Sequence, residues 1–189
     1  MIASSGVLRV RLSGRGGQGL ILAGLVLADA GSREGLHVVQ TQSYGPEARL
    51  GASKSDVILS REEIAFPGVT EPDVLLCLSR DAFSKYGATV AQGGWCMVDR
   101  QVAAEVPVRD AIVLPLVDTA QSLGDVIVTN IVALGALVAL SDAVSQSTLR
   151  ETLRGRVKPH LVDLNERALA AGWELGEKAA SPALPAASR

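Results

Sequence analysis

The sequence predicts a single α/β domain with an open, mostly parallel β-sheet and helices on both faces. Three observations support this fold class. Short runs rich in Val, Ile and Leu recur along the chain, and helical or glycine-rich connectors separate them. Residues 73–79 are almost continuously apolar, as expected for a parallel strand that is buried on both faces. The length of 189 residues suits one domain with a terminal extension.

The first half of the chain contains most of the expected strands. Residues 7–13 alternate between apolar and polar side chains and then break into glycines, which indicates a strand that enters a tight turn. The run 20–28 is apolar on every side, so we expect a helix that either a second layer of this chain or a partner subunit covers. Further strands are expected at residues 36–42, 55–60, 73–79, 95–98 and 111–114.

After Asp118 the pattern becomes helical. In the last expected helix, residues 158–171, Leu161, Leu164 and Ala168 share one face. This is the spacing of an amphipathic helix packed on a domain. From Ala179 onward Ala, Pro and Ser dominate and can bury little surface. We therefore expect a globular unit over residues 1–178 and a disordered tail over 179–189. The predicted helices cover residues 119–123, 130–140, 147–154 and 158–171.

The composition excludes several classes of protein. A formal net charge of -2 and an aromatic content of 3% disfavour nucleic-acid binding, which relies on basic surfaces and stacked aromatic rings. The longest run of apolar residues and glycine, 131–140, is shorter than the roughly 18–20 residues that span a bilayer. The N-terminal residues lack the pattern of a signal peptide. We expect a cytoplasmic protein that binds neither nucleic acid nor membrane.

Cysteine and histidine are too scarce for a metal centre held by this chain alone. Cys77 and Cys96 cannot supply the thiolates of an iron–sulfur cluster or of a four-cysteine zinc site. Each lies in an apolar run, so we expect buried free thiols. The two histidines, His37 and His160, do not have the spacing of a zinc-binding helix.

The clearest local motif is the segment from Gly14 to Gly19, GRGGQG, between the first expected strand and helix. It fits the pattern G-x-G-x-x-G, whose backbone N–H groups at a helix start face a bound phosphate. Such a turn can also serve packing alone. A dinucleotide fold places an acidic residue about twenty residues later to hold the ribose. Residues 38–43 contain no acid, which disfavours NAD binding.

A second motif, YGPEARLG at residues 44–51, follows the second expected strand at the edge where open α/β sheets bind ligands. Arg49 has the planar guanidinium that grips a phosphate or carboxylate through two hydrogen bonds. The alternative is a solvated loop in which Glu47 and Arg49 form a weak ion pair. Asn130 opens an apolar helix, where it is either a polar cap or a ligand contact.

Together these segments resemble the gamma subunit, or gamma domain, of the 2-oxoacid:ferredoxin (acceptor) oxidoreductases. The resemblance rests, in this order, on residues 14–19, 43–51, 71–74 and 130–135. It implies a complex that oxidatively decarboxylates a 2-oxoacid with coenzyme A, giving an acyl-CoA, carbon dioxide and reduced ferredoxin. 2-Oxoglutarate is the favoured substrate, with pyruvate, branched-chain 2-oxoacids and indolepyruvate as rivals.

The resemblance further implies that thiamine diphosphate, magnesium and iron–sulfur clusters lie on alpha and beta partner subunits, with a ferredoxin-like delta subunit as an additional candidate. This chain then holds no catalytic residue. It is a scaffold of the complex that helps to bind coenzyme A. The residues expected at that cofactor-binding site are Gly14, Gly16, Gly17, Gln18, Gly19, Tyr44, Glu47, Arg49 and Asn130.

Two other functions are compatible with parts of the sequence. A free-standing dinucleotide-binding dehydrogenase domain would explain the glycine motif, although the chain lacks the acid that such a domain needs. A purely structural assembly subunit would bury its apolar helices, 20–28 and 130–140, against a partner.

Overall fold

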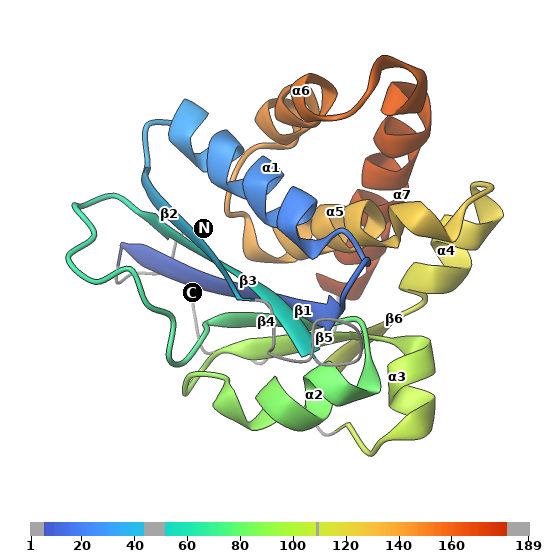
Figure 1. Ribbon diagram of the computed structural model, residues 1–189, viewed down its shortest axis with the longest axis horizontal. Helices are drawn as coiled ribbons and strands as arrows, with labels where there is room; N and C mark the ends of the chain where they lie inside the picture. The colour runs from blue at the N-terminus through green and yellow to red at the C-terminus, as the bar shows by residue number, and fades with distance from the viewer. Residues whose placement is uncertain (1–5, 44–51, 109, 181–189) are drawn as a thin grey trace.

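The computed structural model describes residues 6–43, 52–108 and 110–180, and it contains a six-stranded sheet in the order β2-β3-β1-β4-β5-β6 (Figure 1). The alternating and apolar runs of the sequence form these strands, and the central ones are buried on both faces. The strands are β1 (Val7–Arg15), β2 (His37–Ser43), β3 (Ala52–Ser60), β4 (Val74–Cys77), β5 (Trp95–Asp99) and β6 (Ala111–Leu114).

The sheet is mostly parallel, which confirms the predicted fold class. β1, β4, β5 and β6 pair in parallel, whereas β3 pairs antiparallel with both β1 and β2. Because β2 and β3 are separated only by residues 44–51, the chain lacks the dozen or so residues that a parallel crossover requires. The reversed direction of β3 follows from this short connection.

Helices cover both faces of the sheet (Figure 1). The larger layer contains α1, α4, α5, α6 and α7, and the smaller contains α2 and α3. The predictions missed α2 and α3, which are short and begin at side-chain caps, Ser79 and Asp99. The bounds are α1 (Leu20–Arg33), α2 (Arg80–Tyr86), α3 (Arg100–Glu105), α4 (Leu116–Ser122), α5 (Thr129–Ser141), α6 (Gln146–Arg156) and α7 (Val162–Ala180), with 3-10 turns at Gly87–Thr89, Val126–Val128 and Pro159–Leu161.

The two apolar helices are covered by this chain itself. Residues 129–138 of α5 are all buried, between the sheet and α7. α5 and α7 approach so closely that a Cβ atom at Gly172 of α7 would lie 1.9 Å from the carbonyl oxygen of Val132 in α5. α1 packs on β2 and β3 and is covered by α6. This chain therefore buries residues 129–138 of α5 by itself, whereas Ile21, Leu22 and Leu25 of α1 stay partly exposed.

The C-terminal helix is longer than the sequence predicts. α7 ends at Ala180, so residues 179–180 of the expected tail are helical, and residues 181–189 lie outside the described part of the chain. Among the described residues, no helix combines the length and the apolar character needed to cross a membrane.

Candidate functional site

The glycine motif forms the turn that connects β1 to α1, as the sequence predicts. β1 and β4 are adjacent and parallel, and the chain continues from them to opposite halves of the sheet. Open α/β sheets bind ligands outside the carboxyl ends of the strands at such a switch point. Gly19 precedes the helix with φ of 69° and ψ of 18°, a left-handed conformation that favours glycine.

The side chain of Gln18 spans this switch point. Its Oε1 atom accepts a hydrogen bond from the backbone N–H of Arg15 at 2.6 Å. Its Nε2 atom donates to the carbonyl oxygen of Leu78, just beyond the end of β4, at 3.2 Å. Both polar ends of this side chain are thus engaged by the protein itself.

Two of the motif glycines make room for side chains of this chain. A Cβ atom at Gly14 would lie 2.3 Å from Oε1 of Gln18, and one at Gly19 would lie 2.4 Å from Nδ2 of Asn130. Gly17 differs, because nothing lies within 4 Å of the equivalent position and its φ is 89°. Gly16 and Gly17 are exposed, so the outer part of the turn is the part that a ligand can reach.

Asn130 joins the turn from α5. Its side chain is buried, and Nδ2 donates to the carbonyl oxygen of Gly19 at 2.9 Å. The N-cap of α5 is Val128 and carries no side-chain cap, so Asn130 does not cap its own helix. The structure therefore brings together Gly14, Gly16, Gly17, Gln18, Gly19 and Asn130 at one edge of the sheet.

The electrostatics of the turn favour an anion. No side chain caps the N-terminus of α1, and its first turn contains no acid. The first N–H groups of a helix lack partners inside the helix and carry partial positive charge. In the described part of the chain, no hydrogen bond engages the N–H of Gly16 or Gly17. Arg15 adds an exposed guanidinium to the same turn.

The remaining predicted site residues, Tyr44, Glu47 and Arg49, lie outside the described residues. The structure does describe the residues on either side of this segment, Ser43 and Ala52. Ser43 ends β2, and Ala52, which begins β3, pairs with Arg15 in the ladder between β1 and β3. The described flanks of the YGPEARLG segment, Ser43 and Ala52, therefore lie at the sheet edge that carries the glycine turn.

The sequence did not reveal a buried charge cluster on the α2 side of the sheet. Arg11 is 3% exposed, and its guanidinium binds Asp56 with Nε 2.8 Å from Oδ1. Lys54 contacts the other oxygen of this carboxylate at 2.6 Å, and the Tyr86 ring lies 5.1 Å from the Arg11 guanidinium carbon. Arg11 lies between Val10 and Leu12 in a buried strand, which is the signal that could have identified it. We interpret this cluster as structural.

The prediction of buried free thiols is confirmed for Cys77 and Cys96, which lie on neighbouring strands. A hydrogen bond with Cys77, together with burial, raises the pKa of the Cys96 thiol well above its ordinary value, so this thiol stays protonated. Within the described ranges, no group of three or more His, Cys, Asp or Glu side chains is arranged to hold a metal ion.

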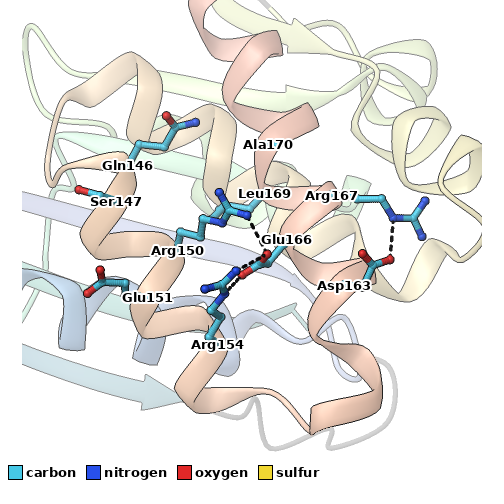
Figure 2. Close-up of a pocket in the computed structure, with 10 residues that line it drawn as sticks. All are labelled: Gln146, Ser147, Arg150, Glu151, Arg154, Asp163, Glu166, Arg167, Leu169 and Ala170. Atoms are coloured by element: carbon cyan, nitrogen blue, oxygen red, sulfur yellow. Dashed lines mark hydrogen bonds and ion pairs between the residues drawn. The ribbon is translucent and has the colours of Figure 1, made fainter.

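A separate groove of about 610 Å³ lies between α6 and α7 (Figure 2). Glu166 reaches across it and accepts hydrogen bonds from Arg150, at 2.9 Å, and from Arg154. These arginines, Arg154 above all, lower the pKa of Glu166 to about 2. No residue of the glycine turn lines this groove, and we interpret its ion pairs as a clamp between the two helices.

Comparison with known proteins shows the family to which sequences of this kind belong. The family model described as pyruvate ferredoxin/flavodoxin oxidoreductase matches residues 9–175. A 2-oxoglutarate synthase subunit KorC from Methanocaldococcus jannaschii is 40% identical over 175 residues, which cover 89% of this chain and 94% of that protein. A ketoisovalerate oxidoreductase subunit VorA from Methanothermobacter thermautotrophicus is 35% identical, but the match covers only 36% of its length.

Solved structures show the same relationship. The gamma subunit of a keto/oxoacid ferredoxin oxidoreductase from Geobacter sulfurreducens is 41% identical and superimposes with a TM-score of 0.83, over 92% of this chain and 98% of that one. A 2-oxoglutarate:ferredoxin oxidoreductase from Magnetococcus marinus, solved with 2-oxoglutarate, coenzyme A and succinyl-CoA bound, is 26% identical with a TM-score of 0.81. That match covers 92% of this chain and 31% of the longer chain.

Proposed function

The chain belongs to the pyruvate ferredoxin/flavodoxin oxidoreductase family, and we propose that it is the gamma subunit of a 2-oxoglutarate:ferredoxin oxidoreductase complex. The observation that carries this proposal is the match in length and sequence to separate KorC subunits, at 40% identity over 94% of the relative. The VorA and Magnetococcus marinus chains contain the same unit as about a third of a longer chain. The preference for 2-oxoglutarate over the other 2-oxoacids rests on sequence similarity, because the KorC relative is 40% identical to this chain and the VorA relative 35% identical.

In this proposal the complex converts 2-oxoglutarate and coenzyme A to succinyl-CoA and carbon dioxide, and ferredoxin accepts the electrons. Thiamine diphosphate with magnesium supplies the carbanion chemistry and iron–sulfur clusters carry the electrons. The residues of this chain do not fit either task. It has only two cysteines, both buried, and its sequence contains neither the Gly-Asp-Gly nor the later Asn-Asn that hold thiamine diphosphate and its metal. The catalytic groups therefore belong to alpha and beta partner subunits, with a ferredoxin-like delta subunit as a further partner.

The contribution of this chain is to scaffold the complex and to bind a phosphate of coenzyme A. The exposed part of the glycine turn offers the backbone N–H groups of Gly16 and Gly17 beside the start of α1. A helix N-terminus contributes about 0.3–1 kcal/mol per favourable charge, and more when the site is partly buried. Arg49 adds a guanidinium from the segment whose flanks meet the same sheet edge. Tyr44 and Glu47 belong to this segment too.

Substitutions in the assembled complex test the coenzyme A contribution. Gly16→Val places a branched side chain on the outer turn, and Arg49→Ala removes the guanidinium. Both variants are expected to raise the KM for coenzyme A while the KM for 2-oxoglutarate stays unchanged. Arg167→Ala on α7, remote from the turn in sequence and absent from its contacts, is the control and should alter neither constant. Unchanged coenzyme A affinity and turnover in both turn variants would exclude this role.

The alternative of a free-standing dinucleotide-binding domain lacks a residue that such a domain needs. A dinucleotide-binding fold carries an acidic residue near the end of its second strand to hold the ribose, and β2 contains none. We expect coenzyme A to raise the melting temperature of the complex and NADH to leave it unchanged. The opposite pattern would favour a dehydrogenase domain.

A further inference from the structure

We propose that the side chains of Gln18 and Asn130 are positioning residues, which hold the glycine turn in the conformation that presents its outer N–H groups to coenzyme A. This inference rests on the proposed function, because it concerns how the turn is prepared for that ligand. It assigns to both residues a role other than ligand contact.

The two side chains connect the turn to two distant parts of the fold. Gln18 bonds to the backbone of Arg15 within the turn and to Leu78 after β4, which is 60 residues away in the sequence. Asn130, 111 residues from Gly19, bonds to the carbonyl oxygen of that glycine from the start of α5. The turn is therefore fixed on one side to the sheet and on the other to the most deeply buried helix of the larger layer.

The same contacts give both side chains a structural role in the turn that needs no ligand. Oε1 and Nε2 of Gln18 each have one protein partner, which leaves one lone pair and one N–H of the amide unengaged. Asn130 is 3% exposed, and its Nδ2 atom faces Gly19. A phosphate that binds the outer turn meets Gly16 and Gly17 instead.

A turn with four glycines needs such restraint. Glycine populates both signs of φ readily, and it loses more conformational freedom on ordering than any other residue. Gly17 and Gly19 both have positive φ, so the observed conformation is one of many that the sequence alone would allow. A loop that is already ordered before binding costs less affinity than one that the ligand must order. The hydrogen bonds of Gln18 and Asn130 provide this order.

The test uses the assembled complex with Gln18→Met, which keeps the length of the side chain but removes both hydrogen bonds. Asn130→Asp is the second variant, because it keeps the shape and replaces the donor to Gly19 with an oxygen. Gln121→Met, on the exposed surface of α4, is the matched control. Hydrogen exchange of residues 14–19, the KM for coenzyme A, kcat and the melting temperature are measured for each.

We expect both turn variants to speed hydrogen exchange at residues 14–19 and to raise the KM for coenzyme A on the order of tenfold, with kcat nearly unchanged. Exchange in β5 and α7 should stay as in the parent, which separates a local change from general unfolding. Unchanged exchange in the turn overturns the inference. Faster exchange with an unchanged coenzyme A affinity also overturns the inference. If Gly16→Val still weakens that affinity, the proposed function stands without it. If Gly16→Val and Arg49→Ala also leave the affinity unchanged, the coenzyme A role itself fails.

Discussion

The close contact between α5 and α7 predicts that alanine at Gly172 destabilises the domain, although alanine favours helices. A Cβ atom at this position would lie 1.9 Å from the carbonyl oxygen of Val132 and 2.7 Å from its carbonyl carbon. These are backbone atoms, which cannot move away by a change of rotamer. The two helices would have to separate along a contact that also includes Gly135 and Gly176.

The magnitude follows from two opposing effects. Replacing glycine by alanine inside a helix stabilises it by about 0.8–1 kcal/mol. Overpacking a close-packed interior costs about 1–3 kcal/mol and occasionally more. Because the clash at Gly172 is with backbone, we expect the upper end of that range and a net loss of about 2 kcal/mol. For a domain of this length the loss corresponds to a decrease in Tm of about 4–8 °C.

Thermal unfolding of the full chain, followed by circular dichroism, measures this effect. Gly155→Ala on α6 is the matched control, because nothing lies within 4 Å of its Cβ position. The control should leave Tm unchanged or raise it slightly, since only helix propensity changes. If Gly172→Ala raised Tm as much as Gly155→Ala does, the reasoning about the helix contact would be refuted.

Two further predictions concern ion pairs. Glu166→Gln should lower Tm by about 1–4 °C at neutral pH, because Arg150 and Arg154, whose side chains are largely exposed, lose a charged partner. The folded-state pKa of Glu166, about 2, lies below its ordinary value of 4.5, so this stabilisation is present above about pH 4.5 and is lost as the pH falls towards 2. The difference in Tm between parent and variant should shrink over that interval, and a constant difference would contradict the assignment. Arg11→Met should destabilise the fold by about 3 kcal/mol in urea unfolding, because Asp56 stays buried with one cation fewer. The double variant Arg11→Met/Asp56→Leu should be less destabilised than the single one, and additive losses would argue against a coupled pair.

The sequence predicted the features that depend on neighbouring residues. The path from β1 through the glycine turn into α1 was predicted because alternation, glycine spacing and an apolar run follow one another within about 25 residues. The burial of α5 agrees with the apolar run over residues 131–140, but the sequence did not show that α7 of the same chain covers it.

Features that depend on distant contacts were not predicted. The hydrogen bonds of Gln18 to Leu78 and of Asn130 to Gly19 were not predicted, because only the fold brings these partners together. The burial of Arg11 was not predicted, because it depends on the position of β1 between β3 and β4. The short helices α2 and α3 have too few turns to show a helical period in the sequence.

The central claim is that this chain is the gamma subunit of a 2-oxoglutarate:ferredoxin oxidoreductase complex. It is tested most directly by purifying the chain with its bound partners and measuring reduction of ferredoxin by 2-oxoglutarate and coenzyme A. We predict that alpha and beta subunits copurify and that ferredoxin reduction requires both substrates and is faster with 2-oxoglutarate than with pyruvate. A chain that purifies without these partners, or a complex that does not reduce ferredoxin with 2-oxoglutarate, would contradict the claim.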